Sequence, residues 1–257
     1  MANNRFEGRV ALVTGGASGM GRQIALSFAQ EGAKVMIGDI QEDAGAETVG
    51  LITKAGGTAS FLRTDVSKSA DVNALVNAAV STFGGLNHSV NAAAIEGEAP
   101  ELALLEEDVF DRIIAVNLRS VYLSMRAEVQ AYLAAGTGGT IVNIASTNSY
   151  RPQPGQSAYT ASKFAVAGIT KAAAIEYAGR GIRINAVAPG SIDTPMLRNA
   201  MARRKRGSEE DTINRLSLIG RFGTVEEIAH GTLWLSSDEA TYTMGHVLAV
   251  DGGYLSR

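Results

Sequence analysis

Short apolar segments alternate with longer, helix-periodic segments along almost the whole chain, and this alternation restricts the fold more than any other feature. The short segments lie at 10–13, 34–37, 86–90, 140–144, 182–187 and 247–250. Continuous apolar runs of this length are typical of strands buried on both faces of a parallel sheet. The longer segments lie at 21–30, 41–54, 70–83, 108–133, 157–178 and 225–235. The chain is therefore predicted to be an α/β protein with a doubly wound parallel sheet and helices on both faces.

One polar stretch, 191–218, interrupts this rhythm and is too long for an ordinary connection. Long connections often cover binding sites, so we expect a lid over a substrate here. Its basic run at 203–206 is also compatible with a solvated helix face. Right-handed crossovers place a binding crevice at the carboxyl ends of the strands. The length of 257 residues, without an evident linker, predicts a single domain over residues 1–257.

Composition excludes several kinds of protein. The chain has no cysteine, which rules out disulfides, thiolate metal sites and a cysteine nucleophile. A net charge of -3 gives no electrostatic reason to expect a nucleic-acid partner. The first residues lack the apolar core of a secretory signal, and no apolar run reaches the ~18 residues of a membrane helix. We therefore expect a soluble, cytoplasmic protein without a membrane partner.

A glycine-rich turn, TGGASGMG at 14–21, joins the first predicted strand to the first predicted helix. Glycines let the backbone approach an anion, and the helix N-terminus offers unpaired N–H groups and the positive end of a dipole. This arrangement predicts a pyrophosphate site, although tight turns without a ligand also contain clustered glycines. The residues predicted to hold the cofactor are Gly15, Ser18, Gly19, Met20 and Gly21.

Asp39 ends the second predicted strand, 18 residues after Gly21. An acid near this distance accepts hydrogen bonds from the adenosine ribose hydroxyls and repels a 2′-phosphate. Neither Ser18 nor Ile40 supplies a cation for such a phosphate, so the pattern favours NAD over NADP. The alternative is that Asp39 only caps the helix that begins near Gln41.

Tyr159 and Lys163 are four residues apart at the start of a predicted helix and therefore share one face. A nearby ammonium is expected to lower the tyrosine pKa, so that the phenol can act as a general acid or base. Ser146 follows the strand at 140–144, where its hydroxyl can hydrogen-bond a substrate oxygen. Taken singly, such a pair is also common on helix surfaces, and such a serine in ordinary turns.

Asn117 lies on the apolar face of the predicted helix 108–133, four residues from both Ile113 and Val121. A buried amide costs free energy unless it is fully hydrogen-bonded. Two interpretations are open: an asparagine that bends the helix, or one that holds a water in a proton relay.

Together these residues resemble the short-chain dehydrogenase/reductase family from about Arg9 to the C-terminus. The turn at 14–21 matches the family's TGxxxGxG motif, and residues 159–163 match YxxxK. Ser146 lies 13 residues before Tyr159, where the family has its substrate-orienting serine, and Asn117 stands where the family has its fourth catalytic residue.

The resemblance also places further cofactor contacts. Asp65 and Val66, after the third strand, resemble the pair that contacts adenine, and the stretch Pro189, Gly190, Ile192 and Thr194 resembles the one at the nicotinamide end. Residues 250–253 read VDGG, similar to the family's C-terminal signature. The family's NNAG motif is replaced by NAAA at 91–94; Asn91 and Ala93 are still expected to bind the cofactor.

The resemblance implies a single-domain Rossmann fold with seven parallel strands, and an NAD-dependent oxidoreductase that interconverts a secondary alcohol and a ketone. It gives Tyr159 the proton transfer, Lys163 the nicotinamide ribose, Ser146 the substrate oxygen and Asn117 a relay water. No metal is expected, because tyrosine and serine polarise the oxygen. The resemblance also implies a homotetramer or homodimer built on the helices that contain Asn117 and Tyr159.

Two alternatives remain at this point. One is a 3-oxoacyl thioester (acyl-carrier-protein) reductase, whose phosphopantetheine the basic run at 203–206 would bind, although such enzymes usually prefer NADP. The other is a catalytically silent, dinucleotide-sensing protein. We expect the substrate pocket to involve residues 94–97, 147–156 and the 191–218 stretch, with Glu96, Asn148 and Tyr150 as candidates for contacting the substrate.

Overall fold

The computed structural model describes residues 4–96, 100–204 and 208–257. Seven parallel strands form one sheet in the order β3-β2-β1-β4-β5-β6-β7. Their bounds are β1 Val10–Thr14, β2 Lys34–Asp39, β3 Thr58–Arg63, β4 His88–Asn91, β5 Gly139–Ile144, β6 Ile182–Pro189 and β7 Val247–Val250. The strand order reverses between β1 and β4, which opens a crevice at the carboxyl ends of these strands.

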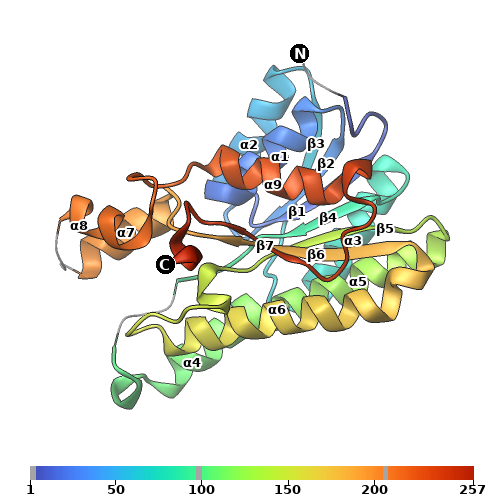
Figure 1. The fold of residues 1–257 in the computed structure, drawn as a ribbon. Helices are drawn as coiled ribbons and strands as arrows, with labels where there is room; N and C mark the ends of the chain where they lie inside the picture. The colour runs from blue at the N-terminus through green and yellow to red at the C-terminus, as the bar shows by residue number, and fades with distance from the viewer. Residues whose placement is uncertain (1–3, 97–99, 205–207) are drawn as a thin grey trace.

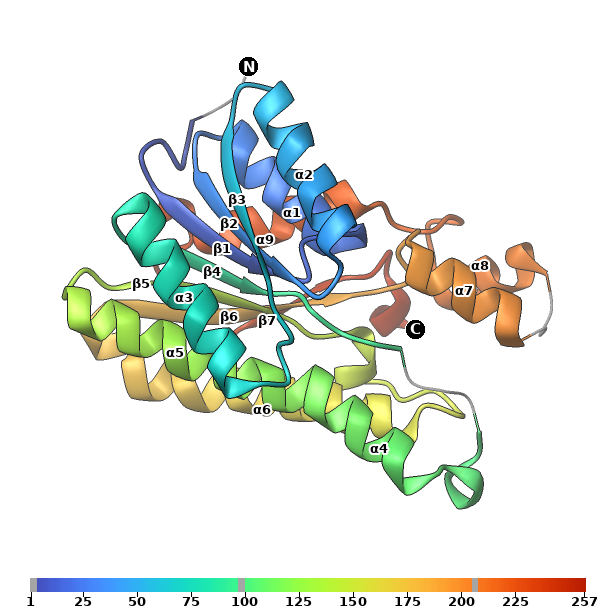
Figure 2. The same ribbon diagram turned by 180° about the vertical axis from the view of Figure 1, so that it is seen from behind.

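Helices cover both faces of the sheet (Figures 1 and 2). One face carries α1 (Gly19–Gln30), α2 (Glu42–Lys54) and α9 (Val225–Ser236), and the other carries α3 (Ser69–Phe83), α5 (Ser120–Ala135) and α6 (Ser157–Tyr177). Each face has its own hydrophobic core. Because apolar side chains are needed on both sides, β1, β5 and β6 are almost wholly buried and mostly apolar. The predicted doubly wound Rossmann fold is confirmed.

The strand that the apolar pattern did not locate is β3, at the edge of the sheet. Its residues are exposed or only partly buried, so its sequence, TASFLR, does not form an apolar run. The six predicted apolar segments all overlap strands.

The predicted helix 108–133 has a break in its regularity. It consists of α4 (Glu107–Ile114), a π-helical turn (Ala115–Arg119) and α5. The π-turn contains Asn117, so this residue coincides with a local distortion of the helix, as one of the two interpretations proposed.

The stretch 191–218 contains α7 (Pro195–Arg204) and α8 (Glu209–Leu216), which project from the carboxyl-end edge of the sheet (Figure 1). Of its basic run, Lys205 and Arg206 lie outside the described residues. The remaining short helical turns are Leu102–Leu104, Thr147–Ser149, Ala178–Arg180, Asp238–Ala240 and Tyr254–Ser256. Among the described helices, none is both long and apolar enough to span a bilayer.

Candidate active site

The glycine-rich turn runs along the end of β4 and into α1. Gly15 has a φ of +72°, and a Cβ placed there would lie 2.7 Å from the backbone of Ala93. Only glycine allows both this conformation and this close approach. Ser18 is the N-cap of α1, but its side chain makes no capping hydrogen bond. The first N–H groups of α1 are therefore left for a ligand.

A cleft of about 310 Å³ opens in front of this turn. Eleven of the predicted cofactor residues line it: Gly15, Ser18, Gly19, Met20, Gly21, Asp39, Ile40, Asp65, Val66, Ala93 and Thr194. The described residues that line it include no lysine or arginine. The uncapped N-terminus of α1 at the wall of this cleft suits the pyrophosphate of a dinucleotide.

Asp39 joins the glycine-rich turn to the start of α2. Its Oδ2 accepts from the backbone N–H of Ala17 at 3.1 Å, and its Oδ1 accepts from the N–H of Gln41 at 3.1 Å. The bond to Gln41 gives Asp39 a local structural role just before α2, although the N-cap residue of that helix is Gln41 itself. Each oxygen keeps a second lone pair, and the carboxylate also lines the cleft. The two interpretations of Asp39 are therefore compatible.

A smaller pocket of about 130 Å³ adjoins the cleft, with which it shares Met20, Thr194 and Met196. Ser146 and Tyr159 both line this pocket. Its wall also includes Glu96, Pro189, Gly190 and Ile192. The structure thus brings together residues from the segment after β5, from α6 and from the segment after β6, next to the cleft.

The proton-transfer pair differs electrostatically from the sequence-based expectation. Burial raises the pKa of Tyr159, the hydrogen bond with the Ser146 side chain lowers it, and the Glu96 carboxylate raises it. The expected lowering of this pKa by Lys163 is not found. The ammonium of Lys163 lies 5.7 Å from the centre of the Tyr159 ring. The hydrogen bond of Ser146 therefore lowers the pKa of Tyr159 more than Lys163 does.

Lys163 is buried beneath Tyr159, only 2% exposed. Its Nζ donates to the carbonyl oxygen of Ile144 at 2.8 Å, at the end of β5. Burial lowers the pKa of Lys163 to about 8, because charge is costly away from water. The amine is therefore held at the strand end, one helical turn from the phenol.

Asn117 is fully buried and its side chain is bonded to the segment after β4. Its Oδ1 accepts from the N–H of Ile95 at 2.8 Å, and its Nδ2 donates to the carbonyl oxygen of Ile95 at 2.9 Å. These two bonds connect the π-turn to the backbone that lines the cleft. The amide is thus satisfied as a buried polar group must be.

Asn91 and Tyr150, like Lys163 and Asn117, are absent from the residues that line the cleft and the smaller pocket. Asn91 donates through its Nδ2 to Asn143 at 2.9 Å and to Glu128 at 3.2 Å, both in the interior, and does not line the cleft. The bond to Asn143 ties β4 to β5. Ala92, which stands at the second asparagine of the NNAG motif, has no amide with which to form such a bond. Tyr150, a candidate for contacting the substrate, instead donates its hydroxyl to the carbonyl oxygen of Val247 at 2.9 Å. Asn148 does line the smaller pocket, while Gly97 lies outside the described residues.

Several residues at the site carried no motif in the sequence. Thr64, Val116 and Met196 line the cleft, and Gln153, Leu197 and Ala200 line the smaller pocket. Thr14 was a motif residue, and its hydroxyl accepts from the N–H groups of Ala92 at 3.2 Å and Ala93 at 3.4 Å. Thr64 directly follows β3 and Val116 lies in the π-turn, whereas Gln153 and the α7 residues fall within the stretches 147–156 and 191–218 that were expected at the substrate pocket.

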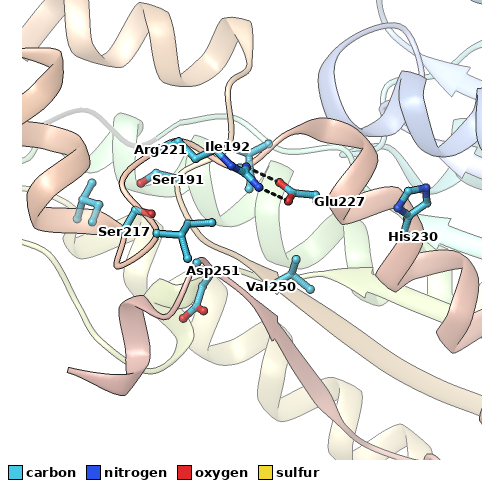
Figure 3. Close-up of a pocket in the computed structure, with 12 residues that line it drawn as sticks. Ser191, Ile192, Ser217, Arg221, Glu227, His230, Val250 and Asp251 are labelled. Carbon is cyan, nitrogen blue, oxygen red and sulfur yellow. Dashed lines mark hydrogen bonds and ion pairs between the residues drawn. The ribbon is translucent and has the colours of Figure 1, made fainter.

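A separate pocket of about 230 Å³ lies behind the segment after β6 (Figure 3). It shares Ser191 and Ile192 with the smaller pocket but contains neither Ser146 nor Tyr159. Arg221 and Glu227 form a two-bonded ion pair in its wall, at 2.7 Å and 3.0 Å. The candidate catalytic residues therefore point to the smaller pocket, not to this one.

Comparisons with known proteins give one consistent result. Residues 15–255 match the family described as enoyl-(acyl carrier protein) reductase. The short chain dehydrogenase/reductase astE of Aspergillus oryzae is 42% identical over 250 residues, covering 96% of this chain and 95% of that protein. A cyclohexanol dehydrogenase of an Acinetobacter species is 42% identical over 255 residues, covering 99% and 98%. The crystal structure of levodione reductase superposes with a TM-score of 0.92 at 35% identity, covering 96% of this chain and 98% of that chain.

Proposed function

The chain belongs to the short-chain dehydrogenase/reductase family, and from this premise we propose that it is an NAD-dependent oxidoreductase that interconverts a secondary alcohol and a ketone. A relative 42% identical over nearly the whole chain is named as a cyclohexanol dehydrogenase, which supports a CH–OH group as the reacting group. The observation that carries the proposal is that the candidate catalytic pocket and the candidate cofactor cleft lie next to each other. The pocket of Ser146 and Tyr159 adjoins the dinucleotide-sized cleft.

In this proposal a nicotinamide cofactor held in the cleft would supply the hydride chemistry at the substrate carbon. Tyr159 takes the hydroxyl proton of the alcohol in oxidation and returns it to the ketone oxygen in reduction. Before the substrate binds, the hydroxyl of Ser146 donates to Tyr159 and favours the phenolate; with the substrate bound, this one proton is donated to the reacting oxygen instead. Both groups reach one oxygen because they line one pocket.

Lys163 and Asn117 support this pair. The ammonium of Lys163 lies behind the phenol and would contact the nicotinamide ribose. Asn117 remains our candidate for holding the relay water, through backbone groups at its π-turn, since its side chain bonds to Ile95. The other cofactor residues are those of the cleft, with Pro189, Gly190 and Ile192 at the nicotinamide end.

The preference for NAD rests on Asp39. Its carboxylate lines the cleft, with lone pairs free for two ribose hydroxyls and a negative charge that opposes a 2′-phosphate. The nearest arginine of the turn is Arg22, whose groups are already bonded to Ala17 and Ala44 carbonyls and to Glu47. NAD is therefore the cofactor that this end of the cleft fits best.

The thioester reductase has less support. Its phosphopantetheine would need a cation near the pocket, and in the basic run at 203–206 the one side chain that the structure describes, Arg203, forms an ion pair with Glu96. The dinucleotide sensor would have no use for Ser146, Tyr159 and Lys163 together. We therefore keep the alcohol dehydrogenase as the conclusion.

We further propose that the protein is a cytoplasmic homotetramer or homodimer, formed through α4, α5 and α6. These helices expose large apolar side chains: Phe110, Tyr122, Leu133, Phe164 and Ile175, the last 84% exposed. Burying such side chains between copies would remove apolar area from water. Light scattering on the purified protein gives the mass that decides between one, two and four copies.

The decisive assay for the function incubates the purified protein with NAD or NADP and a panel of secondary alcohols, with NADH absorbance as the readout. The proposal predicts turnover with NAD. Tight NAD binding without turnover on any alcohol would favour the sensor, and turnover confined to NADPH and 3-oxoacyl thioesters would favour the thioester reductase.

A further inference from the structure

The strand β4 ends at Asn91, and the two residues that follow it belong to the wall of the candidate cofactor cleft. Ala92 and Ala93 line this cleft, and their N–H groups donate to the hydroxyl oxygen of Thr14. The backbone of Ala93 also lies against Gly15 of the glycine-rich turn. An interaction that fixes Asn91 therefore also fixes this part of the wall.

The side-chain amide of Asn91 has only one possible orientation, because the protons around it are already assigned. The hydroxyl of Thr170 donates to the carbonyl oxygen of Val166 at 2.7 Å, so its oxygen accepts from Nδ2 of Asn143 at 2.9 Å. The Oδ1 of Asn143 must then face Asn91, and it accepts from Nδ2 of Asn91 at 2.9 Å. The Oδ1 of Asn91 is buried and has no hydrogen-bond partner among the described residues.

The carboxyl group of Glu128, in α5, contacts this amide and has an unpaired oxygen of its own. It is fully buried, and its Oε2 accepts from Nδ2 of Asn91 at 3.2 Å, whereas Oε1 meets no donor in the described part of the chain. The hydroxyl of Ser89 also lies near this carboxyl group. Its proton is not available, because Tyr132 gives its own to the carbonyl oxygen of Thr140 and so accepts from Ser89.

A proton on Glu128 satisfies both unpaired oxygens, since a neutral carboxyl group donates through one oxygen and accepts through the other. We propose that Glu128 is neutral and that its Oε1–H group donates to Oδ1 of Asn91, which makes Glu128 a positioning residue for the cofactor cleft. Burial acts in the same direction: it raises the pKa of Glu128 to about 8, although the hydrogen bonds with Asn91 and Ser89 lower it. The inference rests on the proposed function in one respect, that NAD occupies the cleft.

The other titratable groups around Glu128 agree with this assignment. Tyr132 of the same helix is also buried, and burial together with Glu128 raises its pKa. His88 of β4 packs against the hydrophobic core on the opposite face of the sheet. Asp71 of α3 and Arg119 of the π-turn are bonded to backbone groups outside α5. Within the ranges that the structure describes, no charged side chain stabilises an ionised Glu128.

Two substitutions test the donor role. In Glu128→Gln the amide offers the same donor and the same acceptor as the neutral acid, at every pH. In Glu128→Met the side chain has a similar size, but Oδ1 of Asn91 loses its donor. Below pH 8 we expect Glu128→Gln to bind NAD like the wild type, and Glu128→Met to bind it about threefold to tenfold more weakly.

The pH dependence of NAD binding distinguishes a neutral Glu128 from an ionised one. Above about pH 8 the wild-type carboxyl group loses its proton and its bond to Asn91, so the Kd for NAD should rise by up to about tenfold per pH unit relative to Glu128→Gln. The pKa of Lys163 is also about 8, but Lys163 is present in both proteins, so their difference reports residue 128. The exposed Glu176→Gln is the matched control and should follow the wild type at every pH. This comparison does not depend on the folding of Glu128→Met.

Two further measurements do not need NAD. Near neutral pH, where exposed carboxyl groups are ionised, infrared spectra of the wild type should contain the C=O stretch of a protonated carboxyl group that Glu128→Gln lacks. Above pH 8, hydrogen exchange at the N–H groups of Ala92 and Ala93 should be about threefold or more faster in the wild type than in Glu128→Gln at the same pH.

Absence of the infrared band would overturn the inference. So would NAD affinities and exchange rates that stay equal in the wild type and Glu128→Gln on both sides of pH 8. If no variant bound NAD while the band and the exchange difference were present, the proposed function would be wrong and the role of Glu128 would stand.

Discussion

The side-chain amide of Asn117 forms two hydrogen bonds with the backbone of one residue, Ile95. It accepts from the N–H at 2.8 Å and donates to the carbonyl oxygen at 2.9 Å. A residue of the π-turn thereby fixes the segment that lines the cleft and continues directly into Glu96. The conformation of a helix and the position of the pocket wall are coupled at this point.

Asn117→Ala should therefore act first on structure. Removing the amide leaves the N–H and carbonyl of Ile95 without their partners, which should lower the free energy of unfolding by about 1–3 kcal/mol. It should also raise KM, because the segment before Glu96 loses its anchor. Urea unfolding and steady-state kinetics measure the two effects. Unchanged stability with a lower kcat would instead place the side chain itself in the proton relay.

Ser146→Ala should change both the rate and its pH dependence. The hydrogen bond from Ser146 lowers the pKa of Tyr159, so removing it should raise that pKa and shift alcohol oxidation to higher pH. Loss of one donor to the reacting oxygen should lower kcat by about a hundredfold or more. The pH profile of kcat/KM checks the direction of the shift.

Glu96→Gln should shift the same profile in the opposite direction. The Glu96 carboxylate raises the pKa of Tyr159, so its neutral replacement should let the phenol ionise at lower pH. If the pH profiles of the Ser146 and Glu96 variants shifted in the same direction, the electrostatic account of Tyr159 would be contradicted.

Asp39→Asn tests cofactor choice with little change of shape. The asparagine keeps an oxygen for the backbone N–H of Ala17 or Gln41 but loses the charge that repels a 2′-phosphate. The ratio of kcat/KM for NAD to that for NADP should fall by about tenfold or more. A wild type that uses NADP as well as NAD would show that Asp39 only caps α2.

Glu128→Gln should remove a pH dependence of stability. Burial raises the pKa of Glu128 from 4.5 to about 8, so the folded protein keeps a proton that the unfolded chain releases. As pH rises from 4.5 to 8, ionisation favours the unfolded chain and stability falls, whereas glutamine cannot ionise. Relative to the wild type, the free energy of unfolding of the variant should increase across this pH window, by an amount on the order of a few kcal/mol.

Thermal melts of both proteins at several pH values measure this gain. The exposed Glu176→Gln is the control, because that side chain has little burial to reverse. If the curves of the Glu128 variant and the wild type ran parallel, the carboxyl would be ionised in the folded state.

Strand and helix positions were predictable from the sequence wherever burial on both faces makes a strand mostly apolar, as in β1 and β6. The edge strand β3 was not, because half of its surface meets water. The residues of the dinucleotide cleft carry motifs, since a close backbone approach such as that of Gly15 to Ala93 demands glycine. Motif spacing therefore placed most of the cleft.

Side-chain direction could not be read in the same way. Asn91 and Tyr150 were expected at the site, but Asn91 bonds to Asn143 and Tyr150 to Val247. The pKa of Tyr159 depends on burial and on Ser146 more than on Lys163, and burial is a property of the assembled fold. The link from Glu96 to Arg203 joins residues more than a hundred positions apart and left no local pattern.

Tyr159→Phe tests the central claim most directly, because it removes one oxygen atom and keeps the ring that packs near Lys163. NAD-dependent oxidation of a secondary alcohol should fall by about a thousandfold or more, with NAD binding retained. Turnover that survives this substitution unchanged would contradict proton transfer by Tyr159.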